Sequence, residues 1–273
     1  MTGNRALPST LVGLARTFAH ALAAEDLARQ PGLLQSLDPR VRLIGISSLV
    51  LAALLAHRIA VIAGLFVVAV ALALFSHVRL ATLAVRVWLV VLLFTGIIGL
   101  PALFLTPGSF LVTSSGTVLP ITLQGLNSAI LLIARVETAA TLTTVLVLTT
   151  PWMALLKSFR ALRVPPEVVM MLAMTHRYVF LLAETAGQMF ESRQSRTVGV
   201  LDRTAQRHMA SRTAGVLLSK SIELSNDVFL AMQSRGFRGD AKVLTEFRMR
   251  AFDYLSLIAF VTVGVAAAWV GRS

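Results

Sequence analysis

A short arginine motif occurs twice in the charged part of this 273-residue sequence. Glu191-Ser192-Arg193-Gln194-Ser195-Arg196 aligns with Gln233-Ser234-Arg235-Gly236-Phe237-Arg238, so each copy has Ser-Arg and a second Arg three residues later. Each copy falls at the predicted C-terminal end of an amphipathic helix. Arginine at such an end interacts favourably with the helix dipole, and Gly236 suits a C-terminal cap. The repetition favours a second interpretation, in which Arg193 and Arg235 bind a partner through their five donors.

Motifs for catalysis or nucleotide binding are missing from the sequence. It has no GxxxxGK[ST] phosphate loop, no GxGxxG, no HExxH and no GxSxG. The absence of cysteine excludes disulfides and thiolate metal sites. The five histidines are scattered, and no two have helical spacing: His20, His57, His77, His176 and His208. We therefore expect a non-catalytic chain with no cofactor and no metal site of its own.

The composition indicates what surrounds these residues. Hydrophobic residues make up 56% of the chain and charged residues only 14%, whereas a soluble domain carries about 25% charged residues. This excludes a soluble globular enzyme, a disordered chain and a coiled coil. It predicts a multi-pass membrane protein of the cell (inner) membrane, in contact with the lipid bilayer. The net charge of +12 then indicates basic cytoplasmic loops rather than nucleic-acid binding.

Apolar stretches predict an all-α fold with about five transmembrane helices. A spanning helix needs about 20 apolar residues, and Asp38-Pro39 is a start signal for the first one. We expect an interfacial or cytoplasmic segment at 1–36, four spans within 37–150, cytoplasmic amphipathic helices at 151–250 and a last span within 251–273. The individual spans are expected to begin near Pro39 and to cover 59–75, 87–105, 127–150 and 254–271, with an uncharged loop at 106–126.

Arg135 and Glu137 lie inside the fourth predicted span. Residues two apart do not face each other on a helix, and ionisable groups inside a membrane are costly and are usually paired or functional. One interpretation is that the two residues snorkel or pair with another span. The other is an intramembrane polar site.

The segment 151–250 differs from the rest because it holds 15 of the 25 Lys and Arg residues. We expect amphipathic helices at 152–163, 167–193 and 213–235, with a polar connection at 194–212. Positive charge marks the cytoplasmic side, so the N-terminus, 76–86 and 151–250 are expected inside and the C-terminus outside. A sixth span at 167–183 is disfavoured because His176 and Arg177 would lie in mid-membrane.

The sequence resembles the T component, the transmembrane coupling subunit, of energy-coupling factor (ECF) transporters. That family has long cytoplasmic coupling helices ending in two Ala-Arg-Gly-like motifs, which here correspond to Ser192-Arg193-Gln194 and Ser234-Arg235-Gly236. The first copy departs from Ala-Arg-Gly on both sides of its arginine, and the second has Ser for Ala. Within the family the chain looks most like the cobalt-transport T component CbiQ, on three segments: 37–43 (LDPRVRL), 149–152 (TTPW) and 232–239 (MQSRGFRG).

The resemblance implies a mechanism and a set of partners. Two copies of a CbiO-like cytoplasmic ATPase would bind ATP and Mg and receive the motif arginines in grooves. A CbiM-like membrane subunit, with a small CbiN-like accessory subunit, would bind the substrate. This chain would transmit closure of the ATPases to that subunit. A T subunit for nickel or a vitamin such as biotin stays open as an alternative. An integral-membrane enzyme or a self-sufficient secondary transporter is disfavoured, because acidic and histidine residues are scattered and no inverted repeat is visible.

Overall fold

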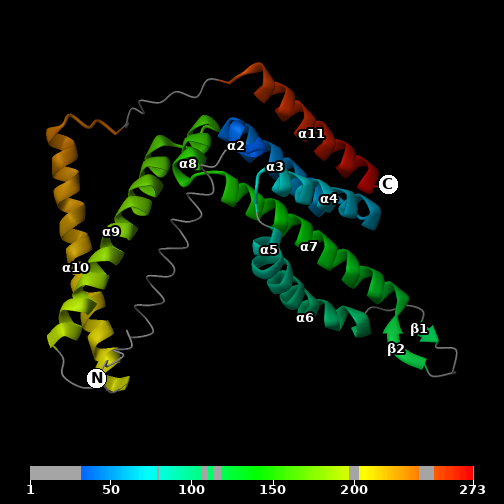
Figure 1. Ribbon diagram of the computed structural model, residues 1–273, viewed down its shortest axis with the longest axis horizontal. Coiled ribbons are helices and arrows are strands. Elements are labelled where there is room, and N and C mark those ends of the chain that lie inside the picture. The colour runs from blue at the N-terminus through cyan, green and yellow to red at the C-terminus, as the bar shows by residue number, and fades with distance from the viewer. Residues whose placement is uncertain are drawn as a thin grey trace. The chain divides into compact units, whose positions relative to one another are not determined.

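The computed structural model describes residues 32–78, 80–105, 110–112, 118–196, 203–239 and 249–272. The chain divides into two compact units. The first, which we call the membrane unit, comprises Ala24–Ser158 and Phe247–Ser273; the second, the arm unit, comprises Met1–Ala23 and Phe159–Glu246. The described part is helical apart from one short β-hairpin, in agreement with the predicted all-α class (Figure 1).

The membrane unit contains most of the helices. In chain order they are α2 (Leu33–Ser36), α3 (Pro39–Leu55), α4 (Ile59–Phe75), α5 (Leu80–Leu83), the π-helical turn η1 (Ala84–Trp88), α6 (Leu89–Leu105), α7 (Leu123–Thr149), the first part of α8 (Trp152–Ala161) and α11 (Ala251–Arg272). The Asp38 carboxylate accepts a hydrogen bond from the backbone N–H of Arg40 at 2.9 Å, and Pro39 follows it at the first helical position. The start signal predicted from the sequence is therefore confirmed, because this cap satisfies a free N–H group of α3.

Two predicted boundaries in the membrane unit are wrong. The segment 76–86, predicted as a basic loop, is helical from Leu80 onward, since α5, η1 and α6 run from Leu80 to Leu105; the apolar helix Leu89–Pro101 lies within the predicted span 87–105. The predicted uncharged loop at 106–126 contains an antiparallel hairpin of β1 (Phe110–Val112) and β2 (Val118–Thr122), and α7 begins at Leu123. β-Branched residues that alternate with other residues over a few positions favour a strand as readily as an irregular loop. The 1–36 prediction lies outside the described residues except for α2.

Three described helices are long and apolar enough to cross a membrane: Gln124–Thr149, Pro166–Arg193 and Ala251–Arg272. Ile59–Phe75 and Leu89–Pro101 are shorter apolar helices. Large apolar side chains on α4, α6 and α11 are exposed in the isolated chain, for example Val67, Phe94 and Trp269, which are 66%, 65% and 77% exposed. Such surfaces are stable only against lipid or another protein. The protein is therefore a membrane protein with several apolar helices suited to spanning the bilayer.

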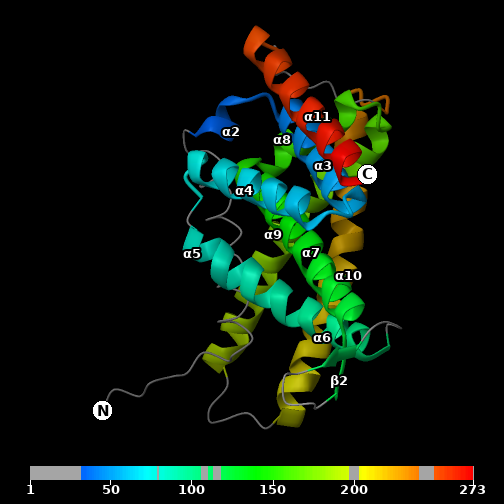
Figure 2. The same ribbon diagram turned by 90° about the vertical axis from the view of Figure 1, so that its right-hand side faces the viewer.

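Small residues bring α3 and α11 into close contact. A Cβ atom placed on Gly45 would lie 2.7 Å from the Phe260 ring and 3.0 Å from Phe260 Cβ, and one placed on Gly264 would lie 3.2 Å from the Ser48 carbonyl oxygen. The two backbones approach closely because these positions lack side chains, which is how helices in membranes gain van der Waals contact. Figure 2 shows α11 lying along α3.

The arm unit is a pair of long helices, α9 (Pro166–Arg196) and α10 (Arg203–Ser234). The predicted polar connection at 194–212 is too long, since α10 begins at Arg203. The residues from Arg203 to Arg212 carry little apolar character, so hydrophobic periodicity could not identify them as helical. The α9 prediction of 167–193 is close to the observed bounds.

The close approach at Gly45 leads to a prediction with an internal control. We expect Gly45→Ala to lower the free energy of unfolding by ~1–3 kcal/mol, the usual cost of overpacking. Gly64 on α4 has open space around its Cα, so Gly64→Ala should raise stability by up to ~1 kcal/mol, the helix-propensity difference between the two residues. Unfolding temperatures in detergent or lipid would measure both variants. Equal shifts of the same sign would show that the α3–α11 contact is looser than described.

Candidate functional site

The arm helices form an antiparallel hairpin that places the two arginine motifs far apart. One groove is lined by residues of α9 from Glu167 to Leu182 and of α10 from Ser221 to Met232, so the start of α9 lies beside the end of α10. In this register Arg235 lies at the end of the hairpin where α9 begins, and Arg193 lies at the end where α10 begins. At 1.5 Å per helical residue, the two arginines are separated by roughly 45 Å along the hairpin.

The second motif is the C-terminal cap of α10. The N–H of Phe237 donates to the Met232 carbonyl at 3.0 Å, and the N–H of Gly236 donates to the Gln233 carbonyl at 2.9 Å. Gly236 has φ +79°, a conformation that glycine adopts without strain. These bonds define a Schellman motif. Capping therefore accounts for Gly236 but not for the Arg235 side chain, which is exposed directly after the last helical residue.

The first motif differs because it lies inside the last turns of α9. Ser192, Arg193 and Gln194 are helical, and α9 continues to Arg196. The two copies share one local feature: the hydroxyls of Ser192 and Ser234 each donate to the carbonyl three residues earlier, at 3.0 Å in both cases. The serine hydroxyl thus makes the same bond at both sites, although Arg193 is helical and Arg235 follows the last residue of α10. Arg193 is partly exposed.

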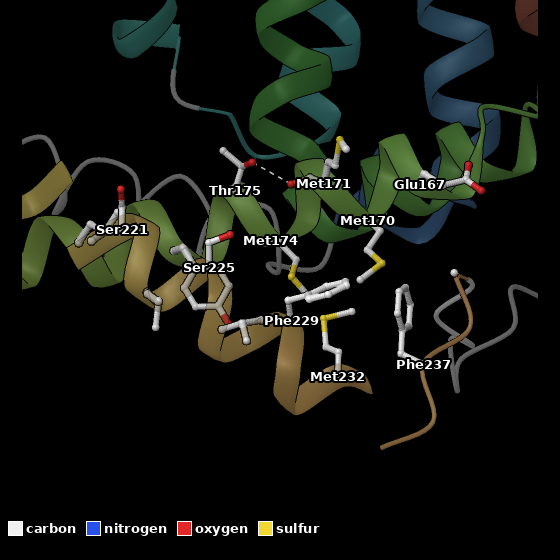
Figure 3. Close-up of a pocket in the computed structure, with 15 residues that line it drawn as sticks. Glu167, Met170, Met171, Met174, Thr175, Ser221, Ser225, Phe229, Met232 and Phe237 are labelled. Atoms are coloured by element: carbon white, nitrogen blue, oxygen red, sulfur yellow. Dashed lines mark hydrogen bonds between the residues drawn. The ribbon is translucent and has the colours of Figure 1, made fainter. Parts of the chain in front are cut away.

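An apolar groove of about 640 Å³ runs between the first half of α9 and the second half of α10. Figure 3 shows the side chains of Met170, Met174 and Met232 turned towards the rings of Phe229 and Phe237. Methionine side chains adapt to irregular apolar surfaces and are frequent where a protein binds helices of a partner. Ala186 and Thr213 are the buried residues among the described residues of α9 and α10. Most of the hairpin surface is therefore available to other molecules.

Arg135 in the membrane unit is paired with the end of another helix. Its Nη2 atom donates to the carbonyl of Ala56, the C-cap residue of α3, at 2.7 Å. The last carbonyls of a helix lack intrahelical partners and carry partial negative charge, so a cation there is favourable. This agrees with the interpretation in which Arg135 pairs with another span. The alternative, an intramembrane polar site of Arg135 and Glu137, stays a prediction.

Glu137 is 9% exposed, and both of its carboxylate oxygens lack a hydrogen-bond partner in the described part of the chain. The hydroxyl of Thr141, one turn further along α7, is bonded to other groups. It donates to the Glu137 carbonyl at 2.7 Å and accepts from the indole N–H of Trp88 at 3.1 Å. A buried carboxylate without partners is costly. No group of three or more metal-ligating residues occurs among the described residues, so Glu137 has no companion ligands there.

Sequence reasoning missed a buried polar junction at one end of the membrane unit. Arg42 is 4% exposed; its Nε and Nη2 atoms donate to the Leu37 carbonyl at 3.1 and 2.8 Å, and Nη1 donates to the Thr149 carbonyl at the end of α7. The N–H of Asp38 donates to Asp253 Oδ1 on α11 at 2.9 Å. Asp253 is 5% exposed, and its Oδ2 accepts from the N–H of Arg250 at 2.8 Å.

This junction joins segments that are remote in the sequence. The segments 37–43 and 149–152 each carried part of the family resemblance, but nothing in their spacing indicated that they touch. Their contact runs through Arg42 and the Thr149 carbonyl, 107 residues apart. The Asp38–Asp253 contact joins residues 215 apart. One signal for this junction was available in the sequence. Charged residues such as Arg42 and Asp253 lie at the ends of apolar stretches, and buried charges require partners.

The fold and the site define a polytopic membrane protein with a long helical arm that carries one arginine motif near the end of each of its two helices. A family model described as cobalt transport protein, CbiQ, matches residues 32–246. The chain belongs to this CbiQ family and is therefore a non-catalytic membrane subunit of a transporter, as its sequence predicted. T subunits of this family bind no cofactor.

Individual relatives agree with this assignment. The cobalt transport protein CbiQ of Rhodobacter capsulatus is 27% identical over 173 residues, covering 63% of this chain and 70% of that protein. An uncharacterized protein of Methanocaldococcus jannaschii is 27% identical over 263 residues, covering 95% of this chain and 90% of that protein. The shared length includes both the membrane unit and the arm unit.

The contrasting environments of Arg135 and Glu137 predict different effects of substitution on stability. Arg135→Met should lower the free energy of unfolding by ~1.5–3 kcal/mol, because the Ala56 carbonyl loses a charge-assisted hydrogen bond. Glu137→Gln should not destabilise the protein, because it removes a buried charge that has no partner. Thermal unfolding of the two purified variants would measure this. Destabilisation by Glu137→Gln comparable to that of Arg135→Met would show that the carboxylate has a partner.

Proposed function

We propose that this chain is the energy-coupling T subunit of an ECF-type ABC importer for cobalt ions. Family membership supports the T-subunit role, and the description of the family and the name of the Rhodobacter relative, a cobalt transport protein, support cobalt. The observation that carries the proposal is the antiparallel arm, which presents one Ser-Arg motif at each end. Two separated contact points are what a subunit needs in order to engage two ATPases at once.

The proposed complex supplies the chemistry that this chain lacks. Two CbiO-like ATPases bind ATP and Mg, and each receives one motif arginine. A CbiM-like membrane subunit binds cobalt, assisted by a small CbiN-like subunit. The apolar groove between α9 and α10 supports a helical partner on the arm, since large side chains such as Met171 and Phe229 are 69% and 54% exposed. The complex resides in the cell (inner) membrane.

The proposed topology has five spans, with the arm unit in the cytoplasm. The spans are α3, α4, the continuous segment from α5 to α6, α7 and α11. The apolar length of α9 would also permit a crossing, but His176 and Arg177 lie near the middle of that stretch. Arg177 is exposed on the helix surface, and a charge facing lipid at the bilayer centre is strongly disfavoured. We therefore place α9 in the cytoplasm.

Single-cysteine labelling tests this topology, because the chain has no native cysteine. Ser114→Cys, in the segment of the sequence between β1 and β2, should react with an impermeant maleimide from the outside. Val179→Cys on α9, at a position 53% exposed, should react from the cytoplasmic side only. Val67→Cys on α4, at a position 66% exposed, is the lipid-facing control and should stay unreactive. Protection of Val179→Cys equal to that of the control would make α9 a sixth span.

The motif arginines should be needed for coupling. Arg193→Ala or Arg235→Ala should reduce Co²⁺ uptake, because losing one partner of a buried interfacial charge pair costs ~2–5 kcal/mol, or about 30-fold or more in affinity. The double variant should also lose the co-purifying ATPases. In each single variant the intact motif at the other end of the arm can still hold the complex together. Lysine at either site should restore function only in part, because it lacks the planar fork.

Arg212→Ala is the matched control, because this exposed arginine lies well before the C-terminal end of α10. It should leave uptake and ATPase binding unchanged. If the double alanine variant of Arg193 and Arg235 retains its ATPases and near-normal uptake, helix capping is their whole role and the assignment of the motifs is wrong.

A further inference from the structure

The Arg42 junction lies close in the fold to the ends of α7 and α11, from which two of the connections to the arm unit, at Ser158–Phe159 and Glu246–Phe247, continue. α7 ends at Thr149, and Pro151 follows before the chain enters the arm unit at Phe159. The chain returns to the membrane unit at Phe247, and α11 begins at Ala251. Thr149 on the outgoing segment and Asp253 on the returning one are both bound to the first residues of α3. The outgoing and the returning chain are thereby tied to one point.

One peptide group lies at the centre of this junction. The Leu37 carbonyl accepts two hydrogen bonds from Arg42, and the N–H of the same peptide, that of Asp38, donates to Asp253. A continuous series of hydrogen bonds therefore runs from Thr149 through Arg42 and this peptide to Asp253. The carboxylates of Asp38 and Asp253 supply the negative charge that balances the buried guanidinium. Every member of the series is less than a tenth exposed.

We propose that Arg42 is the positioning residue that holds the two roots of the coupling arm, the end of α7 at Thr149 and the start of α11 at Asp253, in fixed positions within the membrane unit. Movement of the arm is then transmitted to the membrane unit instead of being lost where the arm is attached. This inference rests on the proposed coupling function. Movement of the arm can reach the membrane unit only if the segments that attach the arm do not shift. At the outgoing root, Pro151 has no N–H, and the Thr149 carbonyl belongs to the last turn of α7, where intrahelical donors run out. Arg42 supplies the missing donor.

A purely structural role would look different. Arg135 provides the comparison, because it is also an arginine of this unit that donates to a carbonyl at a helix C-terminus, that of Ala56. That contact joins α7 to the end of α3 and involves no residue within 20 positions of any of the connections to the arm unit. If Arg42 only stabilises the helices, conservative changes at Arg42 and Arg135 should have the same kind of effect.

The test uses the assembled transporter, with its ATPases and substrate-binding subunit, reconstituted in lipid vesicles with Co²⁺ as the probe. A lysine at position 42 can donate to the Thr149 or the Leu37 carbonyl but cannot bridge both as the fork does. We expect Arg42→Lys to keep the ATPases bound and hydrolysing ATP, while the Co²⁺ taken up per ATP hydrolysed falls about tenfold, because lysine can hold only one of the two carbonyls at a time. Arg135→Lys should leave this ratio unchanged, even if it lowers the unfolding temperature.

A ratio that is unchanged in Arg42→Lys, or lowered equally in Arg135→Lys, would overturn the proposal. If Arg42→Lys does not accumulate in the membrane, Asp253→Asn provides the same measurement at the returning root, because its amide group cannot accept from both Asp38 and Arg250. If neither variant accumulates while Arg135→Lys does, the junction is required for folding and the separate coupling role is wrong. Failure of the wild-type chain to bind ATPases or support Co²⁺ uptake would instead refute the proposed function.

Discussion

The membrane unit depends on one hydrogen-bonded peptide, the bond between Leu37 and Asp38. Its carbonyl is held by Arg42 and its N–H by Asp253, and through Arg42 it also reaches the last residue of α7. Three helices therefore share one polar contact, although each could have ended separately in water. In a low-dielectric environment an unmet carbonyl or N–H costs several kcal/mol. Helix ends near the bilayer are for that reason strong determinants of which helices lie together.

Two arginines, the buried Arg42 and the partly buried Arg135, satisfy unpaired carbonyls at the two ends of α3. Arg42 acts at the start of the helix, where it serves carbonyls from residues 37 and 149, and Arg135 reaches the carbonyl of Ala56 at its end. Arginine is suited to this use because it stays charged and offers several donors in fixed directions. Glycines then allow α11 to lie against α3 along its length. Hydrogen bonds at the ends of α3 therefore fix its alignment with the neighbouring helices, and small residues fix the distance between α3 and α11.

Much of this arrangement could be predicted locally. The bounds of α4 follow from the charged residues at each side of it, and the start of α3 follows from Asp38 and Pro39, because these signals act within one turn of the chain. The arm helices follow from amphipathic periodicity and from prolines. The positions of the motif arginines at helix ends were also predictable.

Other features of the structure could not be predicted from short stretches of the sequence. The partners of Asp253 and Thr149 lie 215 and 107 residues away, and a single sequence carries no signal for such pairing. The first part of α10 lacks an apolar stripe, so its helicity depends on continuation from the packed half rather than on its own pattern. The short β1–β2 hairpin was invisible because an uncharged segment between two apolar helices fits a loop equally well.

The antiparallel arm has a further consequence, which concerns length. A hydrogen-bonded helix neither stretches nor shortens appreciably, so the separation of Arg193 and Arg235 is set by the number of residues in α9 and α10. The arm thus acts as a molecular ruler, which means that it holds the two arginine motifs at a fixed distance from each other. Inserting one turn in a single helix would shift its motif by about 5.4 Å and break the register with its neighbour, whereas matched insertions in both helices would lengthen the ruler intact. Changes in arm length are therefore tolerable only in pairs, and only together with a change in the spacing of whatever the two ends bind.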